Sequence, residues 1–236
     1  MPATRRPGSV GRRLAIGLAA GAATLLTGCS TPATHPAATT GTVGSSGVEL
    51  AVPAALTEGG LDLRAGPVAV PLELRMPSIG LTAPVVGVGI TPENVMDAPM
   101  GPATDPSWRQ AFWYRGSAIP GAPSTALIAG HVDDPLGRPG VFFNLDDLRP
   151  GDPIVVHDTR VGLDVGYSVT ESKSYALDQM GDPALLSRIY GEGPVQGTWP
   201  RASADGLSHL TLVTCAGDFH GDTHDQRLVV YATRVA

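Results

Sequence analysis

Three side chains in the sequence, Cys215, His131 and Arg227, are of types that together support nucleophilic catalysis. A thiol near its ordinary pKa of about 8.5 is only about 3% ionised at pH 7, so it needs a nearby base or cation to react. An imidazole can be that base. A guanidinium is always charged, and its five fixed donors can hold a developing oxyanion or a substrate carbonyl. Each residue also has an ordinary structural interpretation, as a buried inert thiol, a strand-end imidazole and a solvated strand-entry charge.

All three residues stand at the ends of strand-like segments. His131 follows the small and apolar run 125–130, Cys215 follows 210–214, and Arg227 precedes 228–231. A residue at the point where a strand ends is held by the sheet and still faces a cleft, and such positions often carry functional groups. We therefore treat all three as candidate site residues.

The elements that must position these residues are mainly short strands. Apolar stretches, separated by turns rich in Pro, Gly and Asp, occur at 68–76, 83–90, 125–129, 154–157, 167–170, 209–214 and 228–233. This spacing favours a sandwich or barrel, so we expect an all-β fold. Helix signals are weaker: Asp182 could cap a short helix with Pro183 in its first turn, and 142–148 is a second candidate.

Composition excludes several classes of protein. With two cysteines in 236 residues, a disulfide-stapled fold and a zinc site built from several cysteines are ruled out. The 30 glycines and 22 prolines indicate many turns without wholesale disorder. The net charge of −6 argues against nucleic acid as the main partner. The sequence holds no P-loop and no dinucleotide-binding glycine pattern.

The N-terminus has the pattern of an export signal. Residues 1–28 carry four arginines and no acidic residue, and their apolar run, 14–26, is too short at 13 residues to span a bilayer. The run ends in Leu26-Thr27-Gly28-Cys29, which resembles a lipobox, so we expect Cys29 to be lipidated. An ordinary cleaved signal and an uncleaved anchor are the alternatives. Removal of 1–28 leaves 12 basic and 22 acidic residues, a net charge of −10.

Residues 29–66 form the expected tether. From 30 to 47, 16 of 18 residues are Ser, Thr, Pro, Ala or Gly, so little core can be buried there. We expect a flexible segment with a root-mean-square span of about 35 Å, enough to lift a domain off a membrane surface. A single folded domain is then predicted at 67–236.

Three segments resemble the signature motifs of the sortase family. TLVTC at 211–215 resembles the sortase TLxTC signature, IAGHVD at 128–133 the sortase histidine motif, and QRLVVYA at 226–232 the arginine-bearing final strand. The order of the histidine, cysteine and arginine and the gaps between them also fit sortases. The resemblance extends over about 68–236.

This resemblance implies an eight-stranded β-barrel and a cysteine transpeptidase with hydrolase, thiol-protease chemistry. Cys215 would attack the Thr–Gly bond of an LPxTG-like sorting signal and form a thioacyl enzyme. His131 would protonate the leaving amine, and Arg227 would hold the substrate carbonyl and the oxyanion. Thr214 matches a family threonine that contacts substrate or oxyanion.

The partners implied by the resemblance are secreted proteins with a C-terminal LPxTG-like signal and a peptidoglycan-precursor amine. The lipid anchor on Cys29 would hold the enzyme at the extracytoplasmic face of the cell membrane. No nucleic acid, cofactor or metal is expected.

The motifs look closest to the actinobacterial class E and F sortases, with class F favoured. Ala216-Gly217 stands where many class F relatives have Gly-Gly, and the lipobox stands where many sortases have a transmembrane helix. The segment 176–206 is expected to form the loop that reads the sorting signal, and its composition does not identify the motif.

Other polar residues have weaker support as site residues. His209 lies within the cysteine-bearing strand and is expected to be packed. Asp133 and Asp134 could orient His131 or bind a cation, against the simpler interpretation as a polar turn. Four polar residues follow the cysteine: His220, Asp222, His224 and Asp225. Together they could suggest a metal site, although a solvated loop is favoured.

Two other functions stay open at this point. An L,D-transpeptidase also uses cysteine and histidine, but it would need a Ser-His/Tyr-Gly-Cys context that 213–215 does not supply. A catalytically weak or inactive sortase-like surface lipoprotein would act as a binding module, although the intact trio argues against decay.

Overall fold

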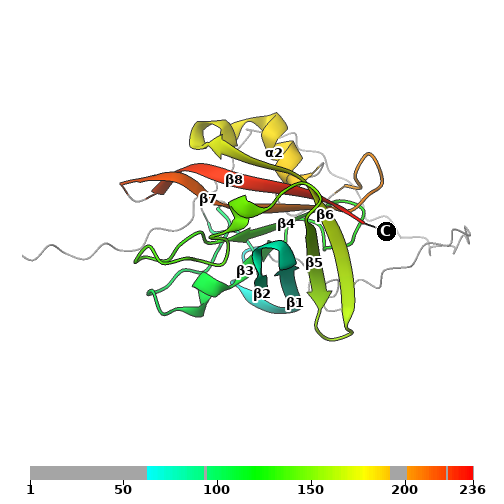
Figure 1. The fold of residues 1–236 in the computed structure, drawn as a ribbon, viewed down its shortest axis with the longest axis horizontal. Helices are drawn as coiled ribbons and strands as arrows, with labels where there is room; N and C mark the ends of the chain where they lie inside the picture. The colour runs from blue at the N-terminus through cyan, green and yellow to red at the C-terminus, as the bar shows by residue number, and fades with distance from the viewer. Residues whose placement is uncertain (1–62, 93–94, 192–200, 222, 236) are drawn as a thin grey trace, which may run out of the picture.

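The computed structural model describes residues 63–92, 95–191, 201–221 and 223–235. Most of the regular secondary structure in the described chain is β-strand (Figure 1). The strands are β1 (Val68–Met76), β2 (Leu81–Val88), β3 (Ala111–Tyr114), β4 (Thr125–Gly130), β5 (Pro153–Asp158), β6 (Leu163–Ala176), β7 (His209–His220) and β8 (Thr223–Arg234). The helical elements are η1 (Pro77–Ile79), η2 (Pro106–Arg109), η3 (Leu145–Asp147), η4 (Leu177–Gly181) and α2 (Pro183–Tyr190), of which only α2 is an α-helix.

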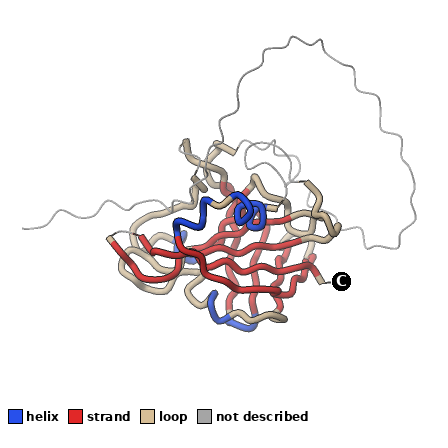
Figure 2. The backbone as a smooth tube through the Cα atoms, turned by 90° about the horizontal axis from the view of Figure 1, so that it is seen from above, coloured by secondary structure: helices blue, strands red, loops and turns tan. Residues whose placement is uncertain are grey.

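The strands close into a barrel in the order β1-β2-β3-β4-β7-β8-β6-β5, and β5 pairs back to β1. Most neighbours are antiparallel, but β2 pairs with β3 and β4 pairs with β7 in parallel. The tube in Figure 2 shows the strands wrapped around one body, with the short helices on its outside. The expected all-β, eight-stranded barrel is confirmed.

The barrel wall that carries the candidate residues has apolar layers on both faces, because side chains alternate along each strand. On β7, Leu210 and Leu212 belong to the cluster inside the barrel, whereas Val213 belongs to a second cluster outside it. On β8, Val230 is in the inner cluster and Val229 in the outer one. The outer cluster also contains side chains of α2, so this helix covers the outer face of the wall.

The helix α2 begins where the sequence predicts. The Asp182 carboxylate accepts hydrogen bonds of 2.9 Å from the backbone N–H groups of Ala184 and Leu185, and Pro183 occupies the first turn. These bonds satisfy donors that a helix N-terminus otherwise leaves unpaired. The second predicted helix, 142–148, contains only the single turn η3.

Two parts of the fold differ from the sequence-based expectation. The strand β3 was not predicted, because all four of its residues are buried and therefore show no polar alternation. At the start of the domain, the predicted tether includes 63–66, yet Leu63 packs in the outer cluster. Its carbonyl accepts a 2.7 Å hydrogen bond from the Ile90 N–H, so the packed chain begins within the segment assigned to the tether.

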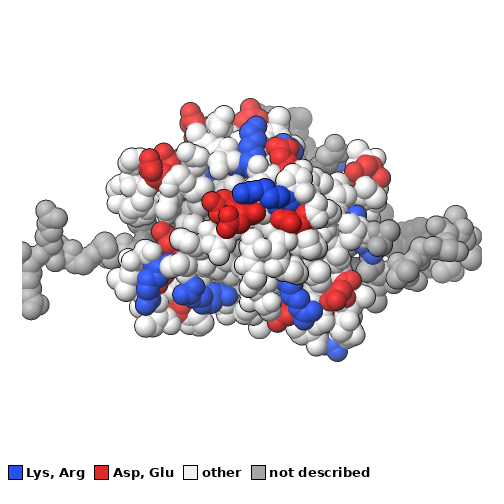
Figure 3. Space-filling model, in the orientation of Figure 1, with Lys and Arg blue, Asp and Glu red and all other residues white. Residues whose placement is uncertain are grey.

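The surface of the described domain carries charges of both signs. On the face drawn in Figure 3, acidic and basic side chains are interspersed, and several lie side by side. Within the described residues, no helix is long and apolar enough to cross a membrane.

Candidate active site

Two of the candidate residues lie on neighbouring strands, β7 and β8, and the third follows the last residue of the next strand, β4. Cys215 on β7 lies directly opposite Arg227 on β8 in the antiparallel pair. On the other side of β7, the parallel register pairs Ala129 of β4 with Val213. Continuation of this register by two residues, just past the end of β4, puts His131 level with Cys215. By this register, imidazole, thiol and guanidinium form one row across the three strand positions.

Alternation along the strands puts this row on the outer face of the barrel wall. Cys215 is two residues from Val213, and Arg227 is two residues from Val229, and both valines point into the outer cluster. Cross-strand neighbours that share a face have their Cβ atoms about 5 Å apart. The thiol and the guanidinium are thus close neighbours on the outer face of the barrel wall.

His131 is held in a tight apolar pocket. It is 5% exposed, its ring lies 4.4 Å from the Trp108 ring and 5.2 Å from the Phe112 ring, and its Nε2 is 2.9 Å from the Pro99 carbonyl oxygen. A carbonyl oxygen can only accept, so Nε2 carries the proton of the neutral ring. Nδ1 is then the basic nitrogen that remains for proton transfer.

Burial lowers the pKa of His131, although the Pro99 carbonyl and the Asp133 carboxylate both act to raise it. Burial also raises the pKa of the Cys215 thiol; Arg227 opposes that effect and Asp133 adds to it. With the imidazole pKa lowered from 6.5 and the thiol pKa raised from 9.0, the resting pair is a neutral thiol beside a neutral imidazole. A thiolate–imidazolium pair is then a minor form of the free enzyme.

Cys215 is a free cysteine of intermediate exposure, so the residue is not sealed within the wall of the barrel. Arg227 is 3% exposed, and its Nη1 donates to the carbonyl oxygens of Gln226 at 2.7 Å and His224 at 3.2 Å. These bonds fix the direction of the guanidinium. A cation held in this way loses little freedom when it meets a developing negative charge.

Thr214 points away from this row. Its buried hydroxyl donates a 2.9 Å hydrogen bond to the Gly130 carbonyl oxygen and so bridges β7 and β4. In this structure the hydroxyl proton is therefore engaged in a hydrogen bond between the two strands. This bond connects Thr214, the residue before Cys215, with Gly130, the residue before His131.

Two residues around the site were not singled out by the sequence analysis. Pro99 and Trp108 come from the segment between β2 and β3, far from the three motifs in the chain, and both contact His131. Asp105 fixes this segment locally, since its carboxylate caps η2 by accepting from the Ser107 N–H at 2.9 Å. The sequence DPSW is a recognisable start of a helical turn, but nothing in it names the imidazole as its contact.

The structure separates the two acidic residues that follow His131. The buried Asp134 accepts from the N–H groups of Leu136 and Arg138 and from Nε of Arg138, so it closes a polar turn. Asp133 instead lies 3.3 Å from Nε2 of His224, on β8. Asp134 therefore belongs to a polar turn, as expected, whereas the side chain of Asp133 contacts His224 on β8.

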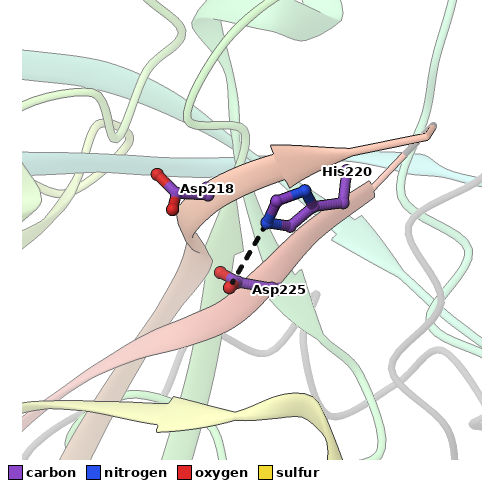
Figure 4. A group of neighbouring side chains, drawn as sticks. All are labelled: Asp218, His220 and Asp225. Atoms are coloured by element: carbon purple, nitrogen blue, oxygen red, sulfur yellow. Dashed lines mark ion pairs between the residues drawn. The ribbon is translucent and has the colours of Figure 1, made fainter.

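The polar residues that gather after the cysteine differ from the group expected from the sequence. Asp218, His220 and Asp225 lie near one another on the β7–β8 hairpin, where His220 faces Asp225 (Figure 4), and one possible ligand atom of each residue lies within 4.8 Å of the others. His224 turns away to Asp133, and Asp222 lies outside the described residues. Asp218 and His220 are exposed, and exposed acidic groups commonly gather without a metal. The set alone does not define a metal centre.

Two further histidines in the described part of the chain have structural partners. His209 lies 3.1 Å from the Asp205 carboxylate and 3.2 Å from the Thr233 hydroxyl, and His157 lies 2.5 Å from Asp164. The predicted lipidation site Cys29 lies outside the described residues.

Several solved structures that match the chain are sortases. They include sortase C1 of Streptococcus agalactiae, with 22% identity and a TM-score of 0.48 over 71% of this chain and 70% of that chain. Sortase A of Corynebacterium diphtheriae has 20% identity and a TM-score of 0.49 over 73% and 63%. A sortase D5 transpeptidase of Clostridium perfringens has 18% identity and a TM-score of 0.46 over 71% and 79%. No curated protein matches the chain.

The chain also matches a family of protein sequences. The model of the family described as Sortase domain matches residues 74–235, which include β2 to β8 and all three aligned side chains. This match covers more than half of the chain, and the chain therefore belongs to the sortase family.

Proposed function

We propose that this sortase cleaves an LPxTG-like sorting signal through a Cys215 thioacyl intermediate and joins the cleaved protein to a cell-wall amine. The observation that carries the proposal is the row of His131, Cys215 and Arg227 on one face of three adjacent strands. The row supplies a nucleophile, a proton carrier and a fixed cation, which are the groups that acyl transfer through a thioester needs.

In the first half of the reaction, the Cys215 thiolate attacks the carbonyl carbon of the Thr–Gly bond. The negative charge that develops on the carbonyl oxygen faces Arg227. When the tetrahedral intermediate collapses, the C–N bond breaks, and the His131 imidazolium gives its proton to the leaving glycine amine. A thioester between Cys215 and the threonine remains.

In the second half, an amine of the peptidoglycan precursor attacks the thioester carbonyl. His131, now neutral, takes the proton that this amine loses, and the C–S bond breaks to release the Cys215 thiolate. A new amide bond joins the sorted protein to the cell wall. The thiolate–imidazolium pair is restored, so each proton that His131 gives in the first half returns in the second.

Thr214 is proposed to contact the substrate or the oxyanion from its position beside the nucleophile. To do so its hydroxyl would exchange the Gly130 carbonyl for a substrate oxygen. Its present bond already serves catalysis indirectly, because it holds the β7 and β4 ends at a fixed spacing.

We also propose that the N-terminal segment exports the chain and that Cys29 carries a lipid anchor. The basic start, the short apolar run and the Leu-Thr-Gly-Cys sequence support this proposal. A Cys29→Ser variant tests it: the variant should no longer take up labelled fatty acid or sediment with membranes. Processing and membrane binding unchanged from the parent chain would overturn the anchor. Membership in class F, or in the related class E, is likewise a proposal from the motifs.

The main experiment is a peptide-library cleavage assay read by mass spectrometry, with and without an added amine. The expected result is cleavage between Thr and Gly, a thioester adduct on the peptide that carries Cys215, and amide products when amine is present. Cys215→Ala is the matched control and should give neither cleavage nor adduct. A folded parent chain that binds sorting peptides without forming an adduct would instead support the binding-module alternative.

A further inference from the structure

One side chain on β8, His224, contacts the segments that carry all three aligned residues. Its Nε2 lies 3.3 and 3.4 Å from the two carboxylate oxygens of Asp133, two residues after His131. Its Nδ1 lies 3.2 Å from the carbonyl oxygen of Gly217, two residues after Cys215. Its own carbonyl oxygen accepts the hydrogen bond from Arg227 Nη1.

The partners of the His224 ring are both acceptors. The Gly217 carbonyl has no proton to give, and an ionised Asp133 carboxylate has none either. A neutral imidazole carries a proton on only one nitrogen, so it can make only one of these two bonds as a donor. A ring that donates from Nε2 gives its hydrogen bond to the Asp133 carboxylate and so links the segment after β4 to the β7–β8 hairpin.

The surroundings of His224 favour a fixed ring. Its side chain is only 14% exposed, and the Phe219 ring packs edge-on against it at 5.1 Å. Gly217, whose carbonyl the ring meets, has a φ of 78°, a left-handed conformation that glycine adopts without strain. This turn of the backbone coincides with the break in register between Ala216 and Phe219.

The charge on Asp133 bears directly on the thiol. Two charged groups act on Cys215: Arg227, its cross-strand neighbour, lowers the pKa of the thiol, and Asp133 raises it. A carboxylate without a partner at this place would oppose formation of the thiolate, and a hydrogen bond donated to that carboxylate offsets part of its charge.

We propose that His224 is a positioning residue of the active site, which pairs with Asp133 and so shields the Cys215 sulfur from the Asp133 charge. The role rests on the proposed function of Cys215 as nucleophile. It assigns His224 to the site instead of to the polar group at the hairpin tip. It also explains why Asp133 can stand close to the nucleophile without disabling it.

The test is the rate at which iodoacetamide alkylates Cys215 in the full-length chain at pH 7.5, followed on the peptide that carries this cysteine. The variants are His224→Ala, Asp133→Asn and the double variant. We expect His224→Ala to slow alkylation roughly threefold or more, because the carboxylate charge is no longer offset. Adding Asp133→Asn should restore the rate to within about twofold of the parent, because the charge itself is gone.

A second pair provides the matched control. His157 also lies beside an aspartate, Asp164, on β5 and β6, so His157→Ala should leave the alkylation rate unchanged. Thermal unfolding checks that His224→Ala is folded. If it is not, His224→Gln replaces it, because glutamine keeps a polar side chain of similar size without the imidazole ring. A His224 variant that alkylates at the parent rate would overturn the proposal, as would a double variant as slow as the single one.

The readout does not depend on a sorting peptide. If the alkylation pattern appears but no peptide is cleaved, the shielding role stands and the proposed transpeptidase function fails. If peptides are cleaved but the pattern is absent, only the role of His224 fails. In an active chain, His224→Ala should lower kcat with little change in KM, and Asp133→Asn should restore kcat in that background.

Discussion

Cys215 and Arg227 are directly opposed residues of an antiparallel strand pair, so the sulfur and the guanidinium share one face of the barrel wall. Their relationship is set by backbone hydrogen bonding along β7 and β8 and not by a loop. A site held on strands keeps its geometry more closely than one held on loops. The cation is thus in place before any substrate arrives.

The fixed direction of Arg227 can be tested by Arg227→Lys. Lysine keeps the charge but lacks the planar fork, so it cannot hold both backbone carbonyls and meet an oxyanion in the same geometry. We expect kcat/KM for a fluorogenic sorting peptide to fall by about 10²–10³, mostly in kcat. Arg227→Ala should fall at least as far. Activity within a few-fold of the parent in the lysine variant would show that charge alone suffices.

The pH dependence of kcat/KM follows from the two shifted groups. The reactive form needs a thiolate and an imidazolium, but the His131 pKa is lowered from 6.5 and the Cys215 pKa is raised from 9.0. Between these two pKa values, Cys215 and His131 together hold one titratable proton. The fraction of this form that is thiolate and imidazolium does not change with pH. We expect a broad bell with an acid limb below pH 6.5 and an alkaline limb above pH 9.0.

Alkylation of the free enzyme separates this arrangement from a preformed ion pair. In a neutral thiol–imidazole pair, the iodoacetamide rate should keep rising through the alkaline limb, because most of the thiolate forms there. A rate already at its maximum near pH 6 would contradict the expectation.

Asp133 raises the pKa of both His131 and Cys215, so its removal should lower both. Asp133→Asn is therefore expected to move the acid and alkaline limbs of the kcat/KM profile to lower pH together. The measurement is the same profile recorded for the parent and the variant in one buffer series. Movement of one limb alone would mean that Asp133 acts on only one member of the pair.

Thr214 combines a structural bond with a proposed contact to substrate. Thr214→Val removes the hydroxyl at nearly constant volume and leaves the buried Gly130 carbonyl without its partner, which costs about 1–3 kcal/mol. Tm should fall by roughly 2–10 °C for a domain of this size. If the hydroxyl also meets the oxyanion, kcat should fall about tenfold or more. Thr214→Ser keeps the hydroxyl, so its Tm and kcat should stay close to those of the parent. A valine variant with lowered Tm and parental kcat would confine the residue to its structural bond.

Trp108 forms the wall that keeps His131 out of water. Trp108→Ala should cost about 3–5 kcal/mol of stability, and in the molecules that stay folded water reaches the imidazole. Because burial is the main cause that lowers the His131 pKa, the acid limb of the profile should move to higher pH. Trp108→Phe keeps an aromatic wall and serves as the control. An acid limb that stays in place in a folded alanine variant would mean that Trp108 does not control the protonation of His131.

The three candidate residues could be picked out from the sequence, because each directly adjoins a segment with a readable apolar pattern; the strands β7 and β8 nevertheless continue past Cys215 and Arg227, which the sequence placed at strand ends. His131, Cys215 and Arg227 all fall at such positions, and Asp182 followed by Pro183 marked the start of α2. The all-β fold followed from the same strand spacing. These features depend on neighbours in the chain, which a single sequence displays.

The parts that were missed depend on contacts between distant segments. β3 is buried on both faces, so its four residues lack the alternation that reveals a half-buried strand. Trp108 and Pro99 meet His131 only after β2 and β3 have paired in parallel. The partnership of His224 with Asp133 spans 91 residues, and one polar residue among several on a hairpin gives no sign of which way it turns.

The parallel pairing of β4 with β7 links activity to the completion of folding. The hydrogen bond between Thr214 and Gly130 joins residues 84 apart in the chain, and contacts over such separations must close a long loop before they return any stabilisation. A chain that ends before β8 has emerged contains Cys215 but has neither Arg227 nor the strand that holds it. The thiol therefore meets the guanidinium only when the last strand is in place, and the proposed acyl transfer has to await the end of folding.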